Sequence, residues 1–188
     1  MAGAEQLCGH CVQREYAFDR ARSYGAYEGT LRELIHLFKY RGMRPLARPL
    51  SACLVEVVRA EAAAGAGPWD AIVAVPLAPG RERERGYNQA RLLAAELARA
   101  IEVPVIDGVL RRVRATPPQT QLTRAQRLEN LRGAFAPGRR ASRVDGRGVL
   151  LVDDVFTTGA TLSACARVLR QARASRVTAF TVARTPEG

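Results

Sequence analysis

The stretch from Gly148 to Thr161, GVLLVDDVFTTGAT, constrains the fold of this chain more than any other. It begins with the apolar run Val149–Val152, which is typical of a strand covered on both faces in a parallel sheet. Two carboxylates and a loop of small and hydroxylic residues follow, and from Thr161 onward the apolar spacing predicts a helix. The predicted order is a buried strand, two acids, a loop and a helix N-terminus.

A loop at the start of a helix presents unpaired N–H groups and the positive end of the helix dipole to an anion. Gly159 lets the backbone approach that anion closely. The hydroxyl donors of the loop are Thr157, Thr158 and Thr161. Without a lysine, this is not the GxxxxGK[ST] loop of nucleoside triphosphate sites. Asp153 and Asp154 can accept hydrogen bonds from sugar hydroxyls or help to hold hydrated Mg²⁺, so the pattern predicts a phosphorylated sugar.

The alternative is a buried strand in which an acid caps the next helix and the threonines are ordinary turn residues. The coincidence of paired acids, hydroxyls and glycine at one strand-to-helix junction favours the ligand site. Adjacent side chains of a continuing strand point to opposite faces. Both acids can therefore serve one ligand only if the strand ends at Asp153 and Asp154, which is the expectation.

The same residues closely resemble the motif with which type I phosphoribosyltransferases bind 5-phosphoribosyl 1-diphosphate (PRPP). The resemblance implies that Asp153 and Asp154 hold the ribose hydroxyls. It also implies that the loop holds the 5-phosphate through Thr157, Thr158, Gly159, Ala160 and Thr161. The implied reaction transfers phosphoribosyl from Mg²⁺-PRPP to a nucleophile and releases diphosphate. The acceptor is not identified, and no residue of the sequence is assigned as a general base.

Arginines follow another predicted strand, Trp69–Pro76. Open α/β sheets place ligands at the C-terminal ends of their strands, so these arginines are suitably placed for a phosphate. The resemblance makes Arg81 and Arg85 the candidate diphosphate contacts, with Arg83 a weaker one. Salt-bridged surface is the alternative for this run of alternating Arg and Glu.

The basic, double-proline stretch within 111–135 has too little apolar content to bury itself. It predicts a mobile loop that closes over the diphosphate, as in these transferases, with an exposed connector as the alternative. The candidate residues of this flexible loop are Thr116, Gln119 and Arg127.

Four motifs narrow the resemblance to the ComF/GntX family of phosphoribosyltransferase-like proteins: RxRGYNQA (83–90), TPPQTxL (116–122), RxxNxRGAF (127–135) and LLVDDVFTTGAT (150–161). The resemblance runs from about Tyr24 onward. Competence members of this family are linked to DNA uptake. The resemblance therefore implies a second possibility for this chain. It could be a noncatalytic module that binds a nucleotide or single-stranded DNA and serves the DNA-uptake machinery.

Cys8 and Cys11 form a single CxxC, which is half of a zinc site. The family usually carries two such pairs in a small zinc finger. Only one pair is present here, so the resemblance implies Zn²⁺ at a site of which this sequence shows half. Reduced free cysteines or a redox pair are the alternatives. Cys53 and Cys165 fall in predicted helices.

The 188 residues suffice for one α/β domain with a small appendage. We expect a Rossmann-like parallel sheet flanked by helices (23–188) and a partial zinc-finger-like N-terminal segment (1–22) that forms a small cap. Predicted elements besides those above are a strand or hairpin arm at 22–27, helices at 30–40, 45–64 and 90–100, short strands at 103–106 and 109–110, and a last strand at 176–183.

The formal net charge of +11 favours anionic partners, although a solvated basic surface is an equal alternative to a nucleic-acid groove. Lys39 is the only lysine, so arginine carries nearly all the positive charge. No apolar stretch reaches membrane-spanning length and no leader pattern begins the chain, so the expected location is the cytoplasm.

Overall fold

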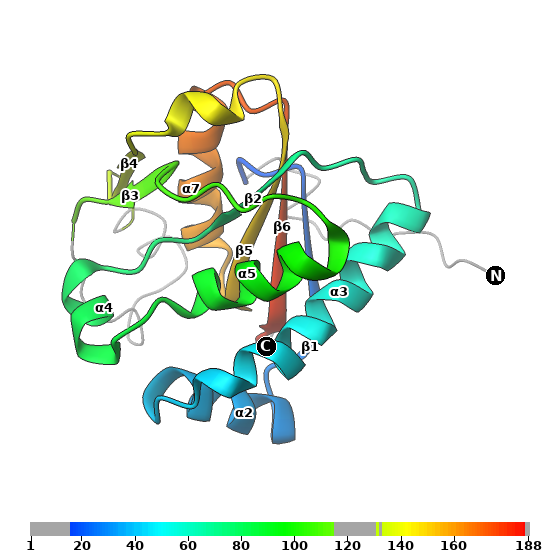
Figure 1. The fold of residues 1–188 in the computed structure, drawn as a ribbon, viewed down its shortest axis with the longest axis vertical. Coiled ribbons are helices and arrows are strands. Elements are labelled where there is room, and N and C mark those ends of the chain that lie inside the picture. The colour runs from blue at the N-terminus through cyan, green and yellow to red at the C-terminus, as the bar shows by residue number, and fades with distance from the viewer. Residues whose placement is uncertain (1–15, 115–130, 132, 187–188) are drawn as a thin grey trace.

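The computed structural model describes residues 16–114, 131 and 133–186, which form an α/β fold on a parallel sheet. Four strands lie in the order β1, β6, β5 and β2, and all neighbours run parallel (Figure 1). Their bounds are Arg20–Ala26 (β1), Ala71–Ala74 (β2), Gly148–Phe156 (β5) and Arg176–Arg184 (β6). The predicted parallel sheet flanked by helices is confirmed.

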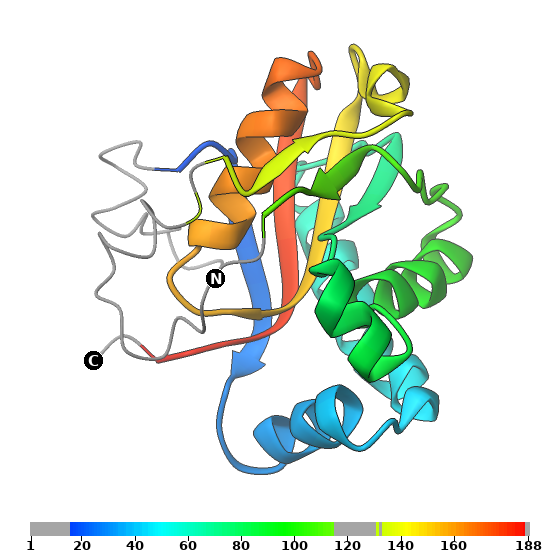
Figure 2. The same cartoon turned by 90° about the vertical axis from the view of Figure 1, so that its left-hand side faces the viewer.

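Helices cover both faces of the sheet (Figure 2). One face carries α2 (Gly29–Tyr40), α3 (Ala47–Ala63) and α5 (Gln89–Ile101). The other carries α7 (Ala160–Gln171) and an antiparallel ribbon of β3 (Leu110–Arg112) and β4 (Phe135–Pro137). A short helix α4 (Pro79–Arg85) and two 3-10 turns, Arg44–Leu46 and Ala141–Val144, complete the described elements. No helix in the described ranges has the length and apolar character needed to cross a membrane.

β5 divides the hydrophobic core into two clusters. Val149 and Leu151 belong to the cluster under α7, whereas Leu150 and Val152 belong to the cluster under α3 and α5. All four side chains are fully buried. Because successive side chains of a strand point to opposite faces, the unbroken apolar run supplies both clusters, as predicted for a strand covered on both sides.

Of the two predictions for residues 22–27, the strand is confirmed and the hairpin arm is wrong, because β1 joins the sheet as a parallel edge strand beside β6. β2 (Ala71–Ala74) is therefore the second strand of the sheet along the chain. The domain boundary expected between residues 22 and 23 falls inside β1. The residues before this strand also join the core domain, since Tyr16 and Phe18 pack against Phe156 with ring centroids 6.3 Å apart in each case. The pairing was hidden because β1 and β6 are separated by about 150 residues of sequence.

Three other predicted boundaries shift. The second helix, predicted from Pro45, begins at Ala47 after a 3-10 turn. The short strand predicted at 103–106 is reduced to one isolated parallel bridge between Val105 and Ile72. The strand predicted at 109–110 begins at Leu110 as β3.

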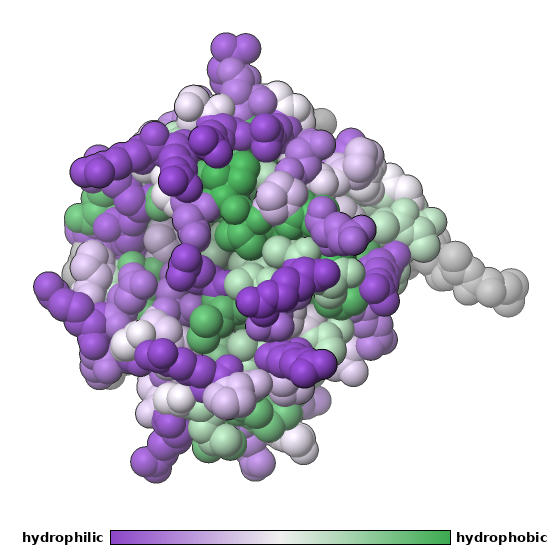
Figure 3. All heavy atoms as spheres, viewed as in Figure 1, coloured by the Kyte–Doolittle hydropathy of each residue, from purple (hydrophilic) through white to green (hydrophobic). Residues whose placement is uncertain are grey.

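A surface groove of about 940 Å³ runs between α3 and α5, on the face where Figure 3 shows apolar side chains among hydrophilic ones. Two of its arginines contact its own walls. Arg99 pairs with Glu96, and Arg59 donates a hydrogen bond of 3.4 Å to the Ala100 carbonyl. We interpret this groove as a packing seam between two helices, and the chemically interesting groups gather elsewhere.

Candidate active site

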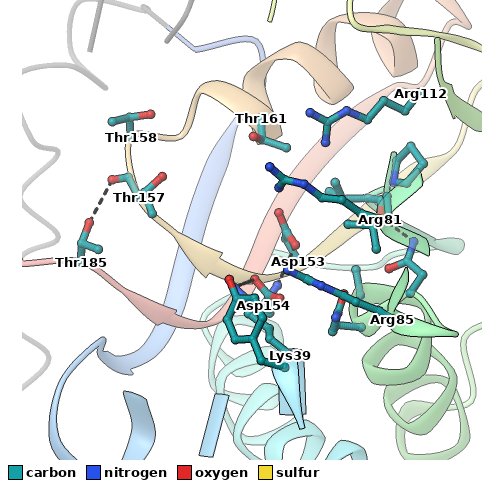
Figure 4. A pocket seen from close by; sticks show the side chains of 17 residues that line it. Lys39, Arg81, Arg85, Arg112, Asp153, Asp154, Thr157, Thr158, Thr161 and Thr185 are labelled. Carbon is teal, nitrogen blue, oxygen red and sulfur yellow. Dashed lines mark hydrogen bonds and ion pairs between the residues drawn. The ribbon is translucent and has the colours of Figure 1, made fainter. Parts of the chain in front are cut away.

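A second hollow, of about 620 Å³, opens at the C-terminal ends of β2 and β5 (Figure 4). Seven of the predicted site residues line it: Arg81, Arg85, Asp153, Asp154, Thr157, Thr158 and Thr161. Gly159 and Ala160 form the N-cap and the first residue of α7. Chain segments far apart in sequence therefore bring both acids, the threonines and the arginines to one pocket, at the end of the sheet where open α/β folds bind ligands.

The strand does not end at the acids, which corrects the expectation. β5 continues through both to Phe156. Both still border the pocket because β2 is much shorter: its last residue, Ala74, lies opposite Val152. Beyond that point β5 has no strand neighbour on the β2 side among the described residues, and the pocket lies there instead. Asp153 and Asp154 reach this space from opposite faces of β5 (Figure 4).

Lys39, at the end of α2, pairs with Asp154. Its Nζ lies 2.8 Å from Oδ1, and the two side chains are only 17% and 11% exposed. Burial alone would lower the pKa of Lys39, but the Asp154 carboxylate and its hydrogen bond raise that pKa above its usual value. The pair places a fixed positive charge beside one of the two acids. Sequence reasoning missed this role, although Lys39 is the only lysine in the chain.

Asp153 lies in a different electrostatic environment. Burial first, and then the neighbouring Asp154, raise its pKa to about 7, while Lys39, a hydrogen bond from the Asp154 N–H and Arg112 oppose the rise. A pKa of about 7 means that this carboxyl group titrates near neutral pH. A raised pKa also means that the negative charge at this position lacks sufficient compensation, so a cation or a set of hydroxyl donors would stabilise it.

In the threonine loop, the backbone conformation and close neighbours of position 159 require glycine. The φ of Gly159 is 72°, and an added Cβ would lie 2.7 Å from Phe156 Cζ and 2.8 Å from Tyr16 Cε1. The Tyr16 hydroxyl also donates a hydrogen bond of 3.0 Å to the Thr158 carbonyl. On the other side, the Thr185 hydroxyl lies 3.3 Å from the Thr157 carbonyl (Figure 4). Residues near both ends of the described chain thus hold the loop in place. Because the loop leads into the N-terminus of α7, its backbone N–H groups can bind an anion.

Two buried polar atoms near the pocket lack a hydrogen-bond partner among the described residues: Nε2 of Gln89 and Oγ1 of Thr158. Both residues line the pocket, and Gln89 is only 2% exposed. Gln89 is the first residue of α5, whose N-cap Asn88 accepts from the Arg91 N–H at 3.3 Å. A buried donor without a partner is costly in a folded protein, and a bound ligand would relieve that cost. The starts of both α5 and α7 therefore border the same space.

Three guanidinium groups lie across the pocket from the acids. Arg81 and Arg85 come from α4, while Arg83 of the same helix is exposed and does not line the pocket. Arg112, from β3, was not predicted. Burial and then the nearby Arg81 lower its pKa. Arg85 and Arg112 are half-buried, whereas Arg81 is exposed. Like charges gathered around one pocket favour a polyanionic ligand, because its negative charges offset their mutual repulsion.

The remaining predicted residues lie outside the described residues. They are Cys8, Cys11, Thr116, Gln119 and Arg127. Within the described ranges there is no group of three or more His, Cys, Asp or Glu side chains that could hold a metal ion. Cys53 and Cys165 lie in α3 and α7, as predicted, and both are free thiols.

Comparison with known proteins places this site in a family. The sequence profile of the Phosphoribosyl transferase domain matches residues 87–188. The chain is 34% identical to Competence protein F of Haemophilus influenzae over 95% of its own length and 79% of that protein. It belongs to the ComF family of phosphoribosyltransferase-like proteins. Other ComF-type relatives are DNA utilization protein YhgH of Escherichia coli, 35% identical over 95% of this chain and 78% of that one, and Competence protein ComFC of Bacillus subtilis, 30% identical over 87% and 64%.

Among solved structures, the allosteric regulatory enzyme of purine biosynthesis aligns with 72% of this ComF-family chain and 26% of its own length. The identity is 23% and the TM-score is 0.45. The profile match covers the acids, the threonine loop and the start of α5, so the matched part of the ComF-family chain holds much of the pocket wall.

Proposed function

We propose that this pocket binds PRPP with Mg²⁺ and transfers the phosphoribosyl group to an acceptor, releasing diphosphate. The observation that carries the proposal is the meeting of two acids, a threonine loop at a helix N-terminus and three arginines around one pocket. Its volume of about 620 Å³ lies within the range of about 300–1,000 Å³ found for small-molecule sites.

Each part of PRPP has a chemically matched wall. The threonine loop and the dipole of α7 suit the 5-phosphate. The carboxylates of Asp153 and Asp154 suit the ribose hydroxyls, which are hydrogen-bond donors. The arginines and the start of α5 suit the diphosphate, because one guanidinium group can donate two parallel hydrogen bonds to two phosphate oxygens. A ligand that fitted only one wall would leave the other two unexplained.

The residues present also fit Mg²⁺. The ion is commonly held by one or two carboxylates together with substrate phosphates, and the raised pKa of Asp153 marks an undercompensated negative charge. When bound, Mg²⁺ would neutralise charge on the diphosphate.

In the proposed reaction, a lone pair of the acceptor forms a bond to C1 of the ribose as the bond from C1 to the diphosphate oxygen breaks. The departing diphosphate takes the electron pair. Arg81, Arg85 and Arg112 stabilise the charge that develops on it, while the acids hold the sugar in position.

The names of the relatives favour a second candidate. One group of relatives is named DNA utilization protein and others are named competence proteins, and this chain carries a net charge of +11. A noncatalytic module would use the same phosphate-binding surface for a nucleotide or single-stranded DNA.

Calorimetric titration with PRPP and Mg²⁺ tests the first candidate. We expect binding by the wild type and by Arg83→Ala, whose side chain lies outside the pocket, and loss of binding when Asp153→Asn and Asp154→Asn are combined. Diphosphate release from PRPP, screened over amines and nucleobases, then tests transfer. Binding of single-stranded DNA with a steep salt dependence, unchanged by the paired Asn substitutions, together with no PRPP binding, would instead favour the second candidate.

A further inference from the structure

An exposed aromatic ring stands at the rim of the pocket. Tyr40, the last residue of α2, lines the pocket and is 59% exposed. It follows Lys39 directly, and Lys39 pairs with the acid proposed to hold the ribose. The ring thus lines the pocket together with Lys39 and Asp154, where the proposed function places the sugar hydroxyls.

The position of this ring is well supported. His36, one helical turn earlier in α2, contacts it with ring centroids 4.8 Å apart. The end of α2 is also tied to the segment after α4, because the Tyr87 hydroxyl donates to the Phe38 carbonyl. Arg44 donates a hydrogen bond of 2.8 Å to the Gly86 carbonyl in the same region. A ring fixed in this way loses little conformational freedom when a ligand stacks on it.

The guanidinium group of Arg85 lies over the ring of Tyr40. Its Cζ lies 4.8 Å from the centroid of Tyr40, within the range of a cation–π contact. Such a contact at an exposed site is weaker than charge-assisted hydrogen bonds to phosphate oxygens. Arg85 also lines the pocket, so a bound diphosphate competes with Tyr40 for the same guanidinium group and wins.

We propose that the acceptor is a planar aromatic heterocycle of the nucleobase class that stacks on Tyr40, and that Arg85 leaves this ring when diphosphate binds. This inference rests on the proposed function, because it needs the sugar at the two acids. The exposed ring beside the sugar position supplies a flat apolar surface, and base–aromatic stacking tolerates any base. A small amine acceptor would leave that surface unused.

Binding of product-like ligands tests the proposal without knowledge of the true acceptor. Ribose 5-phosphate and the 5′-monophosphates of adenosine and uridine share the phosphorylated sugar and differ at C1. With Mg²⁺ and diphosphate present, we expect at least one nucleotide to bind about 5- to 150-fold more tightly than ribose 5-phosphate, the range that stacking on an aromatic side chain gives. Tyr40→Leu should abolish that advantage and leave ribose 5-phosphate affinity unchanged, whereas Tyr40→Phe should keep it.

Arg85 gives a second readout. In the wild type, diphosphate should increase the nucleotide advantage, because it draws Arg85 from the ring. In Arg85→Gln the advantage should be present without diphosphate. Equal affinities of nucleotides and ribose 5-phosphate in the wild type would overturn the inference and leave the sugar site standing. Equal weakening of all ligands by Tyr40→Leu would also overturn it, since the ring would then be structural. Absence of ribose 5-phosphate binding would refute the proposed function itself.

Discussion

Gln89 offers a test in which stability and binding move in opposite directions. Its side chain is 2% exposed, it lines the pocket, and its Nε2 has no hydrogen-bond partner among the described residues. Leaving a buried donor unpaired costs about 1–3 kcal/mol. Methionine has a similar length and no polar hydrogen, and it adapts to irregular spaces. Gln89→Met should therefore raise the free energy of unfolding of the ligand-free protein by about 1 kcal/mol, the low end of that range.

The same substitution should weaken the binding of PRPP. A hydrogen bond from a side-chain amide to a charged phosphate oxygen contributes about 1.5–3 kcal/mol. Its loss corresponds to about 10- to 150-fold weaker binding, since about 1.4 kcal/mol is a factor of ten. Urea unfolding without ligand and calorimetric titration with Mg²⁺-PRPP measure the two effects separately.

Ser51→Ala is the matched control. Ser51 is also 2% exposed, but its hydroxyl is satisfied by a hydrogen bond of 3.3 Å to the Leu93 carbonyl of α5. Its loss should lower stability by about 1 kcal/mol and leave PRPP affinity unchanged. If Gln89→Met lowered stability and left affinity intact, Gln89 would be an ordinary structural residue and the reasoning would be refuted.

Three further predictions follow from the pocket walls. The pKa of Asp153 is raised to about 7 in the folded protein from its usual value of 3.8, so its contribution to stability is present below about pH 4 and is lost as the pH rises to about 7. Urea unfolding at pH 5 and pH 8 should show a smaller decrease for Asp153→Asn than for the wild type, and equal decreases would contradict the assignment. Lys39→Met and Asp154→Asn should each destabilise by about 3–5 kcal/mol because each leaves a largely buried partner unpaired, and the double variant should lose less than the sum. Additive losses would mean that the pair does not interact. Gly159→Ala should lose several times the free energy lost by Gly146→Ala, which is about 1–2 kcal/mol from the backbone alone. The φ values are 72° and 70°, but a Cβ meets two rings at Gly159 and nothing within 4 Å at Gly146. Similar losses in thermal or urea unfolding would show that the rings move aside.

The sequence predicted best what is encoded locally. The strand, the acids, the loop and the following helix are consecutive, and each carries its own pattern: an unbroken apolar run, small hydroxylic residues, then helical spacing. The helix α2 was likewise predicted to within one residue, because its apolar stripe ends at Arg41-Gly42. The run of arginines could be placed at this end of the sheet because it follows a strand, and the family resemblance singled out Arg81 and Arg85 within it.

The parts that were missed depend on contacts between distant segments. The continuation of β5 through the acids is possible because β2 stops at Ala74, and no local pattern in β5 encodes the length of its neighbour. Tyr16 supports the loop across a separation of 142 residues. Lys39 looks like the polar end of an amphipathic helix until the fold sets it against Asp154. Asn88 did carry a readable signal, since Asn before an apolar helix is a good N-cap, and it would have placed Gln89 at the start of α5.

The position of the two acids on opposite faces of one strand has a consequence for the whole domain. Asp153 continues the row of side chains that packs under α7, and Asp154 continues the row that packs under α3 and α5. A small molecule that contacts both acids is therefore connected, through β5, to the hydrophobic clusters on both faces of the sheet, although it lies only at the end of the sheet. Occupancy of the pocket should then raise resistance to unfolding throughout the domain, in α2 as much as in α7, instead of ordering one loop.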